Sequence, residues 1–513
     1  MSIFDKISLK KPRGSVFDLG HEVKMSCNFG ELIPIMCNEV VPGDVFNHSS
    51  EIQLRFAPLL APIMHRVNVY THFFFVPNRL VWDSWEDFMT GGKHGNLQPL
   101  MPYFKLWNME YKNYPLMDYF GIPEWIIPTD KEGLKINALP FRAYNLIFNE
   151  YYRDQNLQDE AVVGTSSGYE DVQNYRSIKK RCWEKDYFTS ALPWPQRGDD
   201  VHISMGDIAP VVPGGDGKPR FNNSEFPSAG LAGSARWAGS RLLSDESGNI
   251  AEWNEETGLV ADLANAKGAT VNDLRKATRL QTWLEKNARA GSRYIEQILA
   301  HFGVRSSDAR LQRPEYLGGG KAPVVISDVP QTSQSTETSA QATLAGNAQS
   351  YSNTHSWRKR FEEHGYVIGI MSVLPRTAYQ QGIPKHFLKE DRFDYYFPEF
   401  AHLGEQPILK KELYVSEDPE YNNEVFGYTP RYAEYKYQSS RVCGDFKKSL
   451  NFWHLGRIFE DKPELNSDFV SCNDEALQRI FAVTDDKEDK IWVQLYNNTR
   501  AFRLMPYHST PQL

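Results

Sequence analysis

Two short segments of the chain place cationic side chains beside aromatic rings. One is Trp357-Arg358-Lys359-Arg360-Phe361, and the other runs from Arg500 to Arg503 with Phe502 between the two arginines. Single-stranded nucleic acids are bound by attraction to the phosphates together with stacking of bases on aromatic rings. The candidate DNA-facing residues are therefore Arg358, Lys359, Arg360, Arg500 and Arg503. The alternative, which is the more common case, is surface charge whose aliphatic stems cover packed aromatic rings.

Other polar clusters give weaker indications of chemistry. Asp391 and Asp394 could form the carboxylate pair of a glycosidase, which must flank one bond, but nothing in the sequence marks a cleft around them. Asp485, Asp486 and Asp489 could hold a hard cation, although the lysines among them favour a solvated turn. The sequence contains no GxxxxGK[ST], GxGxxG, HExxH or GxSxG motif. We therefore predict no catalytic residue, no metal site and no cofactor.

A period-2 pattern over residues 67–75 is the strongest structural signal. One face would carry Val67, Val69, Thr71, Phe73 and Phe75, and the other Asn68, Tyr70, His72 and Phe74. Such alternation of β-branched and aromatic residues predicts a β-strand. Because both faces are large and aromatic, we expect burial on both sides, by the chain's own core on one and by a neighbour on the other. His65 and His72, near this strand, are then expected to pack rather than to bind metal.

Further strands are predicted on both sides of a helical region. The segments 52–56, 365–375, 431–438 and 491–496 show strand patterns, whereas 82–89, 140–152, 274–284 and 295–302 show helical spacing. Strands from distant parts of the chain favour an antiparallel sheet assembled as in a jelly roll. We divide the chain into an N-terminal arm (1–44), a first part of the β-fold with insertions (45–198), a variable insertion (199–269) and a remainder (270–513).

Besides the N-terminal arm, two segments lack a clear period. Residues 199–269 contain ten glycines and few aliphatic runs, which predicts a solvent-exposed insertion: either a flexible loop or, as we favour, a surface projection that meets a partner. Residues 331–356 are poor in charge and in hydrophobic side chains, and predict a long polar loop. Such a loop is unusual in an isolated compact domain and becomes reasonable if neighbouring subunits hold it.

The composition excludes several classes of protein. No apolar run reaches the roughly 18 residues that a bilayer span needs, so we expect no membrane insertion. Five cysteines without a CxxC pair indicate reduced thiols in a cytoplasmic fold. The net charge of −8 is unevenly distributed: residues 199–269 carry −6, residues 270–313 carry +5 and residues 490–513 carry +3. The folded protein could therefore have an acidic side and a basic side.

Four long segments resemble the major capsid proteins of gokushoviruses, which are Microviridae, small tailless phages with single-stranded DNA. The segments are FDLGHEVKMSCNFGELIPIMCNEVVPGDVF (17–46), residues 54–92, residues 274–319 and GYVIGIMSVLPRTAYQQGIPKHF (365–387). The resemblance covers most of the chain, with 199–269 as the departure.

This resemblance implies a mainly β protein, an eight-stranded antiparallel jelly roll with long, partly helical insertions. It implies a non-enzymatic capsid protein that self-associates into a T=1 icosahedral shell around circular single-stranded DNA. The implied location is the virion, assembled in the cytoplasm of a bacterial host. Implied partners are other copies of the chain, the packaged DNA, phage scaffolding, pilot and DNA-binding proteins, and a host cell-surface receptor.

In this family a variable insertion forms a protrusion at the three-fold axes that contacts the host, and the resemblance implies that residues 199–269 are this protrusion. The host-contact candidates within it are Asp216, Lys218, Arg220, Trp237 and Trp253.

Two alternatives remain open: a glycan-hydrolysing enzyme on a jelly-roll scaffold and a carbohydrate-binding module that does not assemble. Both leave the arm, the polar loop and the segregated charge unexplained.

Overall fold

The computed structural model describes residues 13–128, 131–201, 271–330, 344–473, 475–483, 485 and 488–508, and six three-residue strands between 211 and 261. Side chains of those six strands and of residues 353–355 lie outside this description. The chain divides into two compact units, one formed by Met1–Pro195 with Ala288–Leu513 and the other by Gln196–Asn287.

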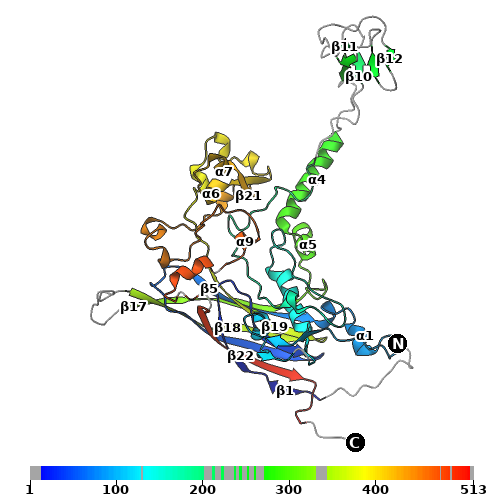
Figure 1. The fold of residues 1–513 in the computed structure, drawn as a ribbon, viewed down its shortest axis with the longest axis vertical. Coiled ribbons are helices and arrows are strands. Elements are labelled where there is room, and N and C mark those ends of the chain that lie inside the picture. Colours follow the sequence, from blue (N-terminus) through cyan, green and yellow to red (C-terminus); the bar gives the residue numbers. More distant parts are fainter. Residues whose placement is uncertain are drawn as a thin grey trace. The chain divides into compact units, whose positions relative to one another are not determined.

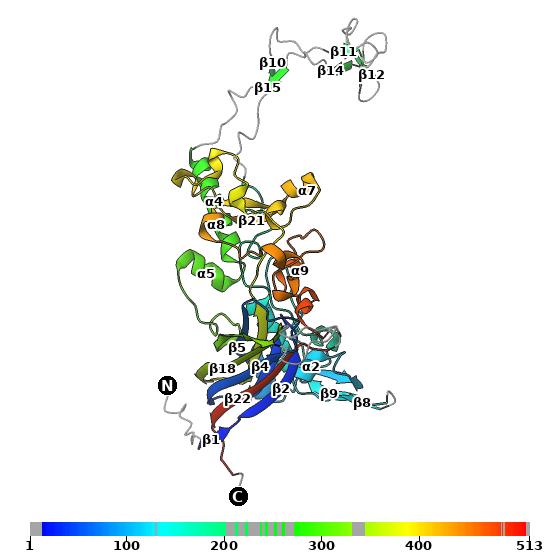
Figure 2. The same ribbon diagram turned by 90° about the vertical axis from the view of Figure 1, so that its left-hand side faces the viewer.

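The first unit contains a six-stranded antiparallel sheet (Figure 2). Its strands follow the order β1 (Ser15–Asp18), β22 (Ile491–Arg503), β4 (Val45–Phe56), β18 (Leu344–Arg360) and β17 (Val325–Pro330), and β2 (His21–Cys27) pairs farther along β22. Strands from both ends of the chain therefore lie side by side.

A four-stranded antiparallel sheet packs against it (Figure 1). Its order is β16 (Glu315–Pro323), β5 (Val67–Pro77), β19 (Gly365–Pro375) and β3 (Ile33–Val40). The main core lies between the sheets, where Phe46, Leu54 and Val493 of the first meet Phe73 and Val367 of the second. The structure is thus a mainly β, antiparallel sandwich of the jelly-roll class.

The outer face of the four-stranded sheet is covered by the chain's own insertion. A second core joins Phe74 and Ile368 of this sheet to Trp82, Phe141 and other side chains of residues 78–175. The insertion comprises η2 (Asn78–Leu80), α1 (Trp85–Thr90), β6 (Tyr103–Leu106), β7 (Asn108–Met109), α2 (Pro115–Tyr119), β8 (Trp125–Ile126), β9 (Leu134–Asn137), α3 (Leu139–Ile147), η3 (Phe148–Tyr152) and η4 (Val172–Tyr175). The predicted burial of β5 on both faces is confirmed. Its outer face, however, is covered by this insertion of the same chain and not by a neighbouring molecule.

Residues 379–480 form a small irregular lobe with a separate apolar cluster, in which Phe188, from an earlier part of the chain, packs with Ile408 and Phe469 of the lobe. Its elements are η5 (Lys385–Phe387), η6 (Arg392–Asp394), η7 (Pro398–Phe400), β20 (Glu405–Leu409), α6 (Lys410–Leu413), α7 (Pro419–Asn423), β21 (Val425–Pro430), α8 (Ala433–Lys436), η8 (Gly444–Lys447), η9 (Asn451–Trp453), α9 (Ser467–Val470) and η10 (Glu475–Ile480). The predicted strand 431–438 is wrong. Tyr432 has a positive φ of 61°, which turns the chain into α8, and period-2 counting cannot register such a turn.

Two segments predicted to lack regular structure contain strands. The proposed arm holds β1, β2 and β3; β3 is largely buried and has no alternating pattern, as expected for a strand covered on both faces. The proposed polar loop is strand β18 from Leu344 onward. Its core-facing residues there are small (Gly346, Ala348, Ser350), so they give no hydrophobic signal. The rest of that loop, 331–343, lies outside the described residues.

The described parts of residues 196–302 contain two helices and six short strands. Helices α4 (Val271–Ala290) and α5 (Tyr294–Phe302) agree with the predicted ones, and α5 ends at Gly303 with φ of 69°. The short strands of the second unit form three nested antiparallel pairs: β10 (Val211–Pro213) with β15 (Leu259–Ala261), β11 (Phe221–Asn223) with β14 (Ala251–Trp253), and β12 (Arg236–Ala238) with β13 (Leu242–Ser244).

Candidate nucleic-acid interface

Arg358 and Arg500 stand in one row across the six-stranded sheet. Asn47 of β4 pairs with Arg358 of β18 on one side and with Arg500 of β22 on the other. Residues directly opposite each other point to the same face of a sheet. All three are exposed, whereas their neighbours Phe46, Trp357 and Ala501 are buried in the core. We call this solvent-facing side of the sheet the open face; Arg360 lies on it two residues beyond Arg358.

The other end of the open face carries aromatic and amide side chains. Trp492 pairs with Arg55, and the next row aligns Lys24, Gln494, Gln53 and Tyr351. Trp492 is 48% exposed and Tyr351 is 70% exposed. Lys24, Gln53, Arg55, Trp492 and Gln494 line a shallow hollow of about 640 Å³. Exposed rings, amides and cations on a flat sheet are suited to stacking and hydrogen bonding of unpaired bases.

Most cations of the open face have no acidic partner. Within the described residues, Arg55, Arg358, Arg360 and Arg500 form no ion pair, and Lys24 lies 3.7 Å from Glu22. The acidic residues on this face are Asp18, Glu22 and Glu51. Four unpaired guanidinium groups therefore remain available to an anionic partner.

Lys359 does not belong to the open face. Successive residues of a strand point to opposite sides, so Trp357, Lys359 and Phe361 point inward while Arg358 and Arg360 point outward. Lys359 Nζ lies 2.6 Å from Glu315 Oε2 on β16. Trp357 stacks on His48, and both flanking aromatic residues are buried. The expected base-stacking role of these two rings is thus replaced by core packing.

Arg503 also has partners within the chain. Its Nε lies 3.3 Å from Asp44 Oδ2, and its Nη2 donates to the Glu39 carbonyl at 2.6 Å. Its side chain is 18% exposed. The C-terminal end of β22 therefore contributes Arg500, but not Arg503, to the unpaired charge.

The remaining polar candidates have structural partners. Asp394 accepts hydrogen bonds from the backbone N–H groups of Glu390 and Asp391, and these lower the pKa of its carboxyl, whereas a glycosidase acid needs a raised one. Asp489 accepts from Asn28 at 2.9 Å, and Asp486 lies outside the described residues. Within the described part of the chain, no group of three His, Cys, Asp or Glu residues could hold a metal ion.

The two histidines near β5 have packing partners. His72 Nδ1 lies 2.8 Å from the Tyr152 hydroxyl, and His65 Nε2 lies 2.6 Å from the Arg376 carbonyl. Both contacts agree with the expected packing role.

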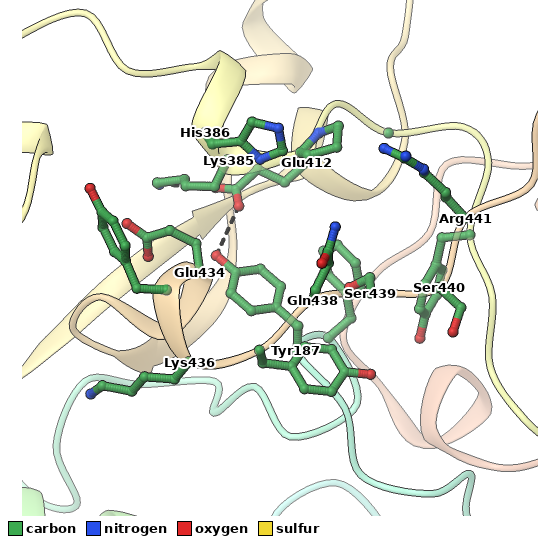
Figure 3. A pocket seen from close by; sticks show the side chains of 16 residues that line it. Tyr187, Lys385, His386, Glu412, Glu434, Lys436, Gln438, Ser439, Ser440 and Arg441 are labelled. Atoms are coloured by element: carbon green, nitrogen blue, oxygen red, sulfur yellow. Dashed lines mark hydrogen bonds and ion pairs between the residues drawn. The ribbon is translucent and has the colours of Figure 1, made fainter.

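A pocket of about 360 Å³ in the irregular lobe contains two carboxylates, Glu412 and Glu434 (Figure 3). Glu412 accepts from the Tyr187 hydroxyl at 2.9 Å and pairs with Lys385 at 3.0 Å. Glu434 accepts from Gln406 Nε2 at 2.7 Å. Both carboxylates are therefore held in structural hydrogen bonds, and the pocket does not favour glycan hydrolysis.

The host-contact candidates fall on the second unit. Asp216, Lys218 and Arg220 lie outside the described residues, and Trp237 and Trp253 lie in β12 and β14, whose side chains are outside the description. Their role stays a prediction.

No described helix is long and apolar enough to cross a membrane.

Comparison with known proteins links this fold to phage capsids. Residues 7–513 match the family described as capsid protein (F protein). The chain is 38% identical over 511 residues to capsid protein VP1 of Bdellovibrio phage phiMH2K, covering 96% of this chain and 94% of that protein. It is 36% identical to capsid protein VP1 of Chlamydia phage 1 (99% and 97% covered) and 32% identical to that of Spiroplasma virus 4 (98% and 95% covered).

Proposed function

The chain belongs to the capsid protein (F protein) family of phages, and from this premise we propose that it builds a T=1 icosahedral shell around circular single-stranded DNA. Its role in the virion is structural rather than catalytic. Shells of this kind repeat a few interfaces by symmetry, so many modest contacts add up. A sandwich with one outer face covered by its own chain and the other open suits a subunit that must also meet a genome.

We place the genome contact on the open face. The observation that carries this proposal is the row of Arg358, Asn47 and Arg500, continued by Trp492 and Tyr351 at the other end of the same sheet. Unpaired arginines would neutralise phosphates, and the exposed rings would stack on bases. Of the five candidates, Arg358, Arg360 and Arg500 are retained, whereas Lys359 and Arg503 already pair with Glu315 and Asp44.

Host attachment is assigned to the insertion 199–269. Its support is that residues 196–287 form a compact unit of their own, with nested strand pairs and an excess of acidic residues. Assembly is expected in the bacterial cytoplasm, with scaffolding, pilot and DNA-binding proteins as the partners that the family resemblance implies.

The test compares particles built from two triple variants. Arg358→Gln/Arg360→Gln/Arg500→Gln removes cations of the open face, and Lys93→Gln/Arg176→Gln/Arg310→Gln removes three exposed cations elsewhere. Gradient-purified, nuclease-treated particles are imaged by electron microscopy and their protected DNA is quantified. We expect isometric particles in every case, with less protected DNA only for the open-face variant. For isolated subunits, the slope of log affinity for an oligo-dT strand against log salt should fall by about 2, because each phosphate contact contributes about 0.7.

Two outcomes would contradict these proposals separately. If the wild-type chain forms no particles while the genome replicates, the shell is wrong. If particles form and the open-face variant protects as much DNA as the control, the shell stands but the genome contact lies elsewhere.

A further inference from the structure

Arg66 and Arg376 oppose each other at one end of the four-stranded sheet. The residues next to them, Val67 and Pro375, are paired as β5 begins and β19 ends, and Arg376 N–H donates to the Arg66 carbonyl at 2.9 Å. Opposite positions bring two side chains to the same face, where like charges destabilise a sheet. Both side chains are exposed, and neither forms an ion pair or side-chain hydrogen bond within the described residues. A bound anion would relieve this repulsion.

A third unpaired arginine, Arg441, lies close to Arg66 and Arg376. Arg66, Arg376 and Arg441 line a hollow of about 340 Å³, which we call the arginine hollow. Arg441 also borders the neighbouring pocket, as Figure 3 shows. The other lining residues are Met64, His65, Thr377, Ala378, Ser440, Val442, Cys443, Phe446 and His454. No carboxylate is among them, so the lining neutralises none of the three charges.

One arginine behind the hollow, Arg479, adds to its positive potential. Arg479 donates only to backbone carbonyls, at 3.1 Å to Asn451, 2.9 Å to His454 and 2.6 Å to Gly456, as well as to Ala476, and has no acidic partner among the described residues. The pKa of His65 is lowered to about 4, mainly by burial, with smaller contributions from His454 and Arg479, while the hydrogen bond to the Arg376 carbonyl opposes the shift. His65 is therefore neutral near pH 7, and the charge of the site is that of its arginines.

We propose that the arginine hollow binds a small phosphate-bearing anion, either inorganic phosphate or the terminal phosphate of a mononucleotide. Planar guanidinium groups match the oxygens of phosphate in bidentate geometry. The Thr377 and Ser440 hydroxyls in the lining can supply further donors. A volume of about 340 Å³ limits the occupant to a small molecule. None of these residues belongs to the open face, so the proposal does not depend on the genome contact.

The test uses the full chain as purified subunits. Thermal unfolding is followed in phosphate and in chloride at equal ionic strength, and affinities for inorganic phosphate and thymidine monophosphate are measured by calorimetry. We expect phosphate to raise the unfolding midpoint, because a ligand that binds only the folded state stabilises it. Arg66→Gln/Arg376→Gln should weaken binding at least roughly tenfold and should be more stable than wild type in chloride, since the repulsion is removed. Arg176→Gln/Arg310→Gln, at exposed sites elsewhere, should leave the phosphate response unchanged.

Three outcomes would overturn the proposal. Phosphate and chloride could act alike on the wild-type chain, or the Arg66→Gln/Arg376→Gln variant could keep the full phosphate response. Alternatively, an oligo-dT strand could bind the hollow while inorganic phosphate and the mononucleotide do not, which would make these arginines part of a DNA surface. If the double variant does not fold, the single variant Arg441→Gln is measured in its place. Arg441 lies outside both sheets, so this variant should weaken phosphate binding without relieving the repulsion between Arg66 and Arg376.

Discussion

The two sheets of the sandwich share one core but differ on their outer sides. All eleven residues of β19 are buried, and the insertion 78–175 covers the outer side of its sheet. In β22 of the other sheet, buried residues alternate with partly or fully exposed ones, and the open face holds unpaired arginines and the exposed ring of Trp492. The same architecture thus has one sheet closed by its own chain and one sheet left with a solvent-facing side.

Because of this difference, we expect residues of the closed sheet to determine stability and exposed residues of the open sheet to determine binding. The closed sheet buries large side chains on both sides, which is the main source of folding free energy. The open sheet contributes half of its side chains to the core and leaves the other half partly or fully exposed. Substitutions on the two faces should therefore affect different measurements.

The largest expected effect comes from the shared core. Phe73→Ala, on β5, removes a ring that is fully buried between the sheets and contacts His48 and Trp357. Large-to-small changes of this kind cost about 3–5 kcal/mol through lost burial and the cavity left behind. The matched variant, Phe502→Ala on the open face, should cost about 1 kcal/mol or less, because that ring is 38% exposed. Urea denaturation of unassembled subunits measures both.

Equal losses in the two phenylalanine variants would contradict the comparison. They would mean that the open face is covered within the subunit itself and is not available to DNA.

Much of the closed sheet could be predicted from sequence. The strands at 67–75 and 365–375 are confirmed. The large side chains on both faces of the first strand and the mostly apolar run of the second reflect coverage on both sides. Helices α4 and α5 follow from apolar spacing and from Gly303. The resemblance to gokushovirus capsid proteins is confirmed by the family match over most of the chain.

Local pattern failed where tertiary structure decides the conformation. Strand β18 begins with small and polar residues, so its partner β4, distant in sequence, determines that it is a strand. Strands β1 and β2 pair with β22, which lies almost at the other end of the chain. Sequence periodicity within a short window contains no information about such partners.

The candidate interface was predicted in part. The cations at 358, 360 and 500 were found from composition, but the acidic partners of Lys359 and Arg503 are distant in sequence and could not be inferred. Trp492 was missed although the signal was present. In the predicted strand 491–496, alternation places Trp492 and Gln494 on the side opposite Ile491 and Val493, which marks a ring on a polar face.

A smaller effect on the free energy of unfolding is expected when a buried histidine of the shared core is protonated. His48 is buried against Phe73 and Trp357, and its Nδ1 lies 2.8 Å from Thr499 Oγ1. Burial, with a contribution from His21, lowers its pKa to about 4. As pH falls from about 6.5 to 4, the unfolded chain binds a proton that the folded chain resists, so the free energy of unfolding falls by about 3 kcal/mol.

The variant His48→Gln removes this titration. We expect its urea midpoint to change less than that of wild type between pH 7 and pH 4, with the other acid-sensitive groups common to both proteins. Parallel pH profiles for the two proteins would show that His48 is accessible to water and that the sheets are less closely packed than the structure indicates.

The smallest effect tests the aromatic end of the open face. Trp492→Ala should weaken binding of an oligo-dT strand by about 1–3 kcal/mol, the usual contribution of one stacked base. Because the ring carries no charge, the dependence of affinity on salt should stay at the wild-type slope, unlike the loss expected for the arginine variant. Trp492→Phe should restore part of the affinity, and Tyr169→Ala, at an exposed aromatic residue elsewhere, should have no effect. If Trp492→Ala binds as wild type does, the phosphate contacts alone hold the strand, and the open face is an electrostatic surface rather than a base-stacking one.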